Sequence, residues 1–123
     1  MRRRLAAAAL VLGMVTVVAN GVSWAQLYGQ QKQAAATKSH MVEATEHTQA
    51  AVENGKAGHA NVVVEHATAA LQHAEAAQKE KADPHKEAAI KGLKEAVEHG
   101  KAGHADVAGK AAAGALEHLK AVK

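Results

Sequence analysis

The chain contains the same short turn twice: residues 54–62 read NGKAGHANV and residues 99–107 read HGKAGHADV. Each copy holds two glycines in a chain that is otherwise rich in strong helix formers. A shift of 45 residues superimposes the copies and also aligns His40 with His85. The repeated unit is therefore a pair of helices joined by this turn, and the sequence predicts an all-α fold, an antiparallel four-helix bundle built from two repeated αα-hairpins.

Capping signals set the expected helix boundaries. Ser39 can cap a first helix that ends near Asn54, with Gly55 as the residue after its end. Asp83 followed by Pro84 is a standard start of a helix. The expected helices are residues 39–54, about 59–79, 84–99 (ending before Gly100) and about 104 to the end; the bundle is residues 39–123, with repeat 1 at about 39–80 and repeat 2 at about 83–123.

The amino-terminal segment has the features of an export signal. Three arginines precede an apolar run from Leu5 to about Val18, and small residues at Ser23 and Ala25 fit a cleavage site. We expect a signal peptide at 1–25, cleaved after Ala25, a flexible tail at 26–38, and a soluble mature protein that is periplasmic or secreted. An uncleaved membrane anchor is the alternative, because the run nearly reaches the length of a spanning helix.

Charge and composition exclude several functions. Three of the 15 basic residues lie in the expected signal, which leaves 12 basic and 12 acidic residues, so the mature chain is neutral. A neutral chain with Tyr28 as its single aromatic residue has neither the charge nor the stacking surface that a nucleic-acid binder needs. There is no cysteine, which excludes thiolate chemistry, covalent haem attachment and disulfides.

Within each expected helix the histidines are seven or fourteen residues apart, so they form rows along the helices. In an antiparallel hairpin, residues at the same height have numbers that add to a constant, which the turns set at 113 and 203. This rule pairs His40 with His73 and His47 with His66 in the first hairpin. In the second hairpin it pairs His85 with His118 and His99 with His104, and it places Gly92 opposite Ala111. His59 faces Asn54.

Facing histidines on packed helices are close enough to share one metal ion. The candidate ligands are all nine histidines: His40, His47, His59, His66, His73, His85, His99, His104 and His118. Carboxylates near them could support binding: Glu43 and Glu95 lie one turn from His47 and His99, and Glu65 and Glu117 adjoin His66 and His118. Nitrogen and oxygen donors without thiolate favour Cu(II) most, and also suit Ni(II), Zn(II) and Co(II).

Together, the export signal, the absence of cysteine and the repeated EHGKAGHADV-type turn resemble the small metal-binding protein family, His-rich four-helix proteins of the bacterial periplasm. The resemblance covers about His40 to Val122. It implies a small soluble bundle that binds several divalent ions, copper especially, for metal storage, scavenging or tolerance. Gly92 and Ala111 depart from the histidine pattern, which suggests a lower metal capacity.

An enzyme is not expected. No Glu-x-x-His pair for a di-iron site and no H-E-x-x-H motif is present, and no serine is left for a hydrolytic triad. The alternative function is a non-metal helical interaction module, such as a periplasmic chaperone or adaptor, which would need a large exposed apolar face. The sequence leaves open a monomer or a dimer, and delivery of the metal to an accepting protein.

Overall fold

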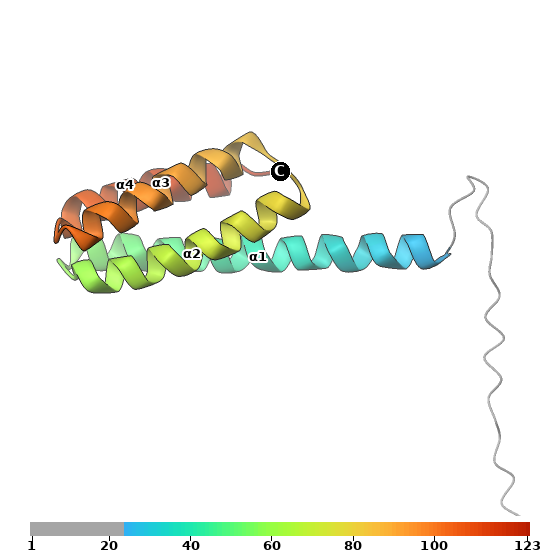
Figure 1. The fold of residues 1–123 in the computed structure, drawn as a ribbon, viewed down its shortest axis with the longest axis horizontal. Helices are drawn as coiled ribbons and strands as arrows, with labels where there is room; N and C mark the ends of the chain where they lie inside the picture. Colours follow the sequence, from blue (N-terminus) through green and yellow to red (C-terminus); the bar gives the residue numbers. More distant parts are fainter. Residues whose placement is uncertain (1–23) are drawn as a thin grey trace, which may run out of the picture. The chain divides into compact units, whose positions relative to one another are not determined.

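Helices account for most of residues 24–123, whose backbone the computed structural model describes; side chains are described for residues 39–123. The helices are α1 (Trp24–Lys56), α2 (Ala60–Glu80), α3 (Pro84–Lys101) and α4 (Ala105–Lys120). Residues 32–123 form one compact unit in which the helices run alternately up and down (Figure 1). The predicted four-helix bundle is confirmed. The expected signal peptide falls largely on residues 1–23, which lie outside the described part of the chain.

The first helix begins earlier than predicted. It starts at Trp24 rather than at the expected cap Ser39, so residues 26–38 are helical. This segment is made mostly of Gln, Ala and Lys, which are good helix formers, and its one glycine costs too little to break the helix. Between residues 24 and 123 no helix is both long and apolar enough to cross a membrane.

Both turns close with the same hydrogen-bond pattern. Gly58 and Gly103 each have a φ of +81°, a backbone conformation that costs glycine little. The N–H of His59 donates to Asn54 O at 2.9 Å and that of Gly58 donates to Gly55 O at 3.2 Å, which is a Schellman motif. The prediction that Gly55 and Gly100 follow the helix ends was wrong, because the second glycine of each turn takes the left-handed conformation and each helix continues to the lysine between them.

The first glycine of each turn instead lies in a contact between helices. Gly55 of α1 is buried against Gly109 of α4, and Gly100 of α3 is buried against Val64 of α2. A Cβ atom on Gly55 would lie 2.5 Å from the Cα atom of Gly109, a distance that side chains do not tolerate. The absence of a side chain therefore lets α1 and α4 pack with their backbones almost touching.

Alanine dominates the core of the bundle. The largest fully buried apolar side chains are Val63 and Leu93. Ile90 and Val97 are partly buried and pack against the same cluster. Small side chains allow close helix approach but bury little area, so individual contacts matter for stability. The fully or almost fully buried alanines are Ala44, Ala51, Ala67, Ala70, Ala74, Ala77, Ala89, Ala96, Ala108, Ala112 and Ala115.

The link between the hairpins contains the predicted helix start and a buried charge. Asp83 accepts a hydrogen bond from the N–H of His85 at 2.7 Å, which confirms it as the N-cap of α3. Lys86 is 1% exposed, and its Nζ donates to Ala77 O at 3.2 Å and to Lys81 O at 2.7 Å. The ammonium group thus satisfies carbonyls at the end of α2, where a positive charge is also favoured by the helix dipole.

Replacing Lys86 with methionine should lower the free energy of unfolding by about 1–2 kcal/mol, because it removes a charged donor from buried carbonyls. Urea unfolding followed by circular dichroism measures this change. Lys91→Met is the matched control on the same helix: its side chain is 73% exposed, so we expect a change below about 0.5 kcal/mol. Equal effects of the two substitutions would contradict the capping role of Lys86.

Candidate metal site

Histidines of α1 and α2 meet across the groove between the two helices. His40 Nδ1 lies 3.1 Å from His73 Nδ1, and His47 Nδ1 lies 3.3 Å from His66 Nδ1. These are the two pairs that the turn-based register predicts. All four side chains are partly exposed to solvent, so each pair is open to an ion arriving from solution.

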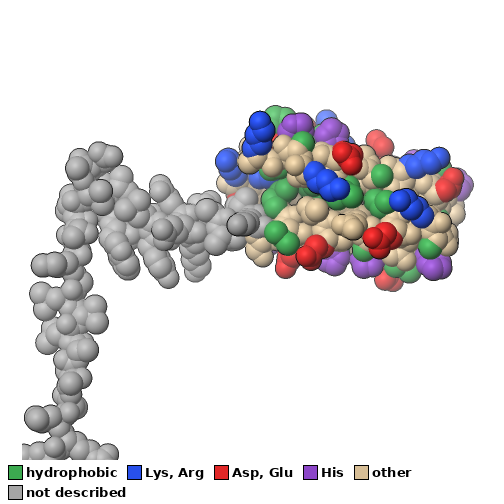
Figure 2. All heavy atoms as spheres, turned by 180° about the vertical axis from the view of Figure 1, so that it is seen from behind, with side chains coloured by type: hydrophobic (Ala, Val, Ile, Leu, Met, Phe, Trp, Pro, Cys, Tyr) green, Lys and Arg blue, Asp and Glu red, His purple; other side chains and the backbone are tan. Residues whose placement is uncertain are grey.

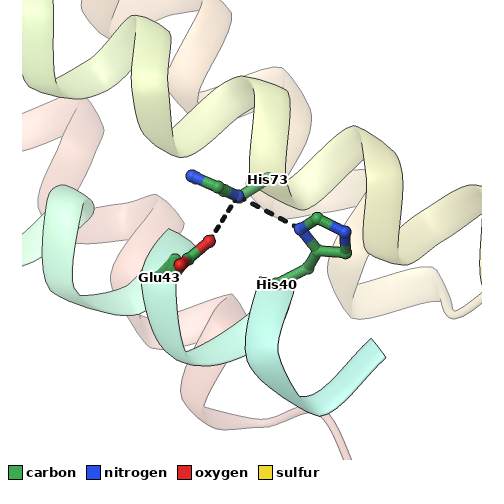
Figure 3. Close-up of side chains that lie close together, drawn as sticks. All are labelled: His40, Glu43 and His73. Carbon is green, nitrogen blue, oxygen red and sulfur yellow. Dashed lines mark hydrogen bonds and ion pairs between the residues drawn. The ribbon is translucent and has the colours of Figure 1, made fainter. Parts of the chain in front are cut away.

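One pair carries a carboxylate as well. Glu43 Oε2 lies 2.9 Å from His73 Nδ1, the same nitrogen that faces His40 (Figure 3). One ligand atom from each of these three side chains lies within 4.8 Å of the other two. The triad therefore combines two residues of α1 with one residue of α2 around a single point.

The chemistry of this contact suits a metal ion. His73 Nδ1 faces a nitrogen and a carboxylate oxygen, but it has at most one proton to donate. An ion would accept electron pairs from all three groups. Ligands about 2 Å from an ion and adjacent around it are about 2.8–3.4 Å apart, and both histidine pairs fall within this range.

Comparison with known protein families agrees with this geometry. The sequence profile of the small metal-binding protein family matches residues 9–122. The chain belongs to this family. Membership of this family makes the protein a metal-binding protein. Among the described residues, His40, Glu43 and His73 form its best candidate site. No curated protein matches the chain.

A second carboxylate approaches the triad of this family member from the end of α2. Glu80 Oε1 lies 3.8 Å from His40 Nε2, and its side chain is 24% exposed. The nitrogen concerned is the one that points away from His73, so Glu80 adds negative charge beside the imidazole while Nδ1 stays available. Glu80 was not predicted as a site residue. The register rule places it opposite residue 33 rather than His40, and the one signal that it lies on the same edge of the helix is its position one heptad beyond His73.

The other predicted carboxylates are placed differently. Glu43 was expected beside His47, but it contacts His73 on the opposite helix because it lies one turn from His40. Glu65, Glu95 and Glu117 are exposed and form no ion pair with a histidine within residues 39–123. Within residues 39–123, the carboxylates that form ion pairs with histidines, Glu43 and Glu80, thus both lie at the His40–His73 pair.

The second hairpin keeps its histidine pairs, with wider spacing. The ring centroids of His85 and His118 are 5.9 Å apart and those of His99 and His104 are 6.5 Å apart, against 5.4 Å for His40 and His73. His85, His104 and His118 are exposed. Figure 2 shows histidine side chains gathered along two edges of the bundle, with lysines and carboxylates between them.

The ninth histidine lies at the first turn. His59 precedes α2, and its Nδ1 lies 3.4 Å from Asn54 Oδ1. The predicted pairing of these residues is therefore present, but one partner is an amide, which is a weaker metal ligand than imidazole. His59 is exposed, and no other histidine contacts it within residues 39–123.

Proposed function

We propose that this protein binds copper as Cu(II) in the cell envelope and serves in storage, scavenging or tolerance of the metal. The observation that carries the proposal is the meeting of His40, Glu43 and His73, whose donors are two imidazole nitrogens and a carboxylate oxygen. For such donors, divalent copper is bound more tightly than nickel, cobalt or zinc. The export signal expected at residues 1–25 supports a location outside the cytoplasm.

Solvent access at the triad supports reversible loading rather than a structural role for the metal. The side chains of His40, His73 and Glu43 are 33%, 28% and 46% exposed. The core closes without them, because the buried cluster consists of other residues, mainly alanines together with Val63, Leu93 and Leu119. An ion can therefore enter and leave while the bundle stays folded.

The alternative function, a non-metal interaction module, lacks its required surface. The large exposed hydrophobic residues in the described part of the chain are Val42 and Val107, at 49% and 38%. Val42 is 13 residues from Gly55, which contacts α4 near Val107, so the two valines are separated by about 20 Å along the bundle. Two isolated valines do not form an apolar face for a client protein.

Copper should raise the melting temperature of the purified protein, because it binds the folded state. At 100 times the dissociation constant the gain is about 2.7 kcal/mol, which corresponds to a rise of about 10 °C or more for a domain of this size. Calorimetric titration and thermal unfolding with Cu(II), Zn(II) and Mg(II) test this. Mg(II) is the control, since it prefers oxygen ligands. A melting curve unchanged by Cu(II) would refute the proposed function.

A further inference from the structure

The two histidine pairs of the first hairpin are connected through ring stacking. The rings of His47 and His73 are parallel within 4°, with centroids 5.8 Å apart. The four imidazoles therefore form a continuous row in the order His40, His73, His47, His66, in which each ring contacts the next. His73 belongs to the triad and His47 to the second pair, so the row joins two potential metal positions.

The second hairpin has no such row, and the reason is a close helix contact. At its middle, Gly92 of α3 stands where the pattern would place a histidine, opposite Ala111 of α4. A Cβ on Gly92 would lie 3.1 Å from the Cβ of Ala115 and 3.3 Å from the carbonyl oxygen of Ala111. A side chain at this position would therefore require the neighbouring atoms of α4 to shift. The pairs at the two ends are 14 residues apart in sequence, which is roughly 21 Å along a helix.

From this difference between the hairpins we propose that the first hairpin binds two metal ions side by side. One ion lies at His40, Glu43 and His73, and the other lies between His47 and His66. The pairs are one heptad apart, so the ions would be separated by about 10 Å or less. Ions in the second hairpin are bound singly. The inference rests on the proposed metal binding and adds a second site and its position.

The two ions should bind in order. The triad has a third ligand and a negative charge from Glu43, whereas no carboxylate contacts His47 or His66 within residues 39–123. The triad therefore fills first. At a separation of about 10 Å, repulsion between two divalent ions in water weakens binding of the second ion by about 20-fold, and the effect is smaller in salt and larger at shorter separations.

Electron paramagnetic resonance of the purified protein with Cu(II) tests the arrangement. At one equivalent we expect the spectrum of isolated copper. When the first hairpin is full, we expect dipolar broadening and a half-field signal from neighbouring ions. His66→Ala should abolish the broadening and keep the first copper, because His66 touches neither His73 nor Glu43. His85→Ala, at the corresponding edge of the second hairpin, should leave the broadening intact.

Two results would overturn the two-ion site. One is a set of isolated copper signals at every loading although several equivalents are bound; this would leave the proposed copper binding in place. The other is loss of the broadening in His85→Ala and its persistence in His66→Ala. Absence of any bound copper would refute the proposed function together with the pair. Circular dichroism confirms that each variant is folded.

Discussion

Replacement of Gly55 by alanine is expected to lower the free energy of unfolding by at least about 2 kcal/mol, although alanine is the better helix former. The added Cβ would lie 2.5 Å from Gly109 Cα and 2.9 Å from Ala105 O. Both atoms belong to the backbone of α4, so no side-chain rotation relieves the contact. Helices α1 and α4 must move apart, and this opens a thin alanine core that has little apolar area to lose.

Gly114→Ala is the matched control because it makes the same chemical change with the opposite outcome. Gly114 also lies within a helix, but a Cβ there meets no atom within 4 Å. Alanine should therefore stabilise the bundle by about 0.5–1 kcal/mol through the reduced entropy of the unfolded chain. Urea unfolding of the two variants gives the difference. A Gly55→Ala variant as stable as the parent would contradict the close packing of α1 on α4.

The sequence was sufficient to predict the fold class and the facing of the histidines. An αα-hairpin is symmetric about its turn, so the position of GKAG determines which residues stand at the same height. An error of one residue in each helix boundary does not change that sum. This is why His40 and His73 are found together although the predicted ends of the first and third helices were wrong.

What the sequence could not show depends on contacts between hairpins and on side-chain rotamers. Gly55 and Gly100 look like caps because each follows a helical run, and their role in helix contacts requires knowledge of α4 and α2. Glu43 lies within one turn of both His40 and His47, and only the structure shows it reaching across to His73. The burial of Lys86 was not predicted, but one signal for it is present in the sequence: Lys86 lies seven residues before Leu93, on the apolar side of α3.

Replacement of His73 by alanine should cause the largest single loss of metal affinity. Its Nδ1 contacts both His40 and Glu43, and its ring stacks on His47, so His73 is the one residue shared by the triad and the row. Loss of an outer-shell group around a metal commonly costs 10- to 100-fold in affinity; removing a ligand should cost at least about 100-fold. His118, exposed in the second hairpin, is the control, and His118→Ala should leave the tightest site unchanged.

The stability of the metal-free protein separates a loss of binding from a loss of folding. The His73 side chain is 28% exposed and lies outside the buried core, so the free energy of unfolding without metal should change by no more than about 0.5 kcal/mol. Calorimetric titration with Cu(II) should then show the tightest equivalent missing in His73→Ala and present in His118→Ala. If both variants kept that equivalent, neither His73 nor His118 would be a ligand of the tightest copper, which would contradict its assignment to the triad.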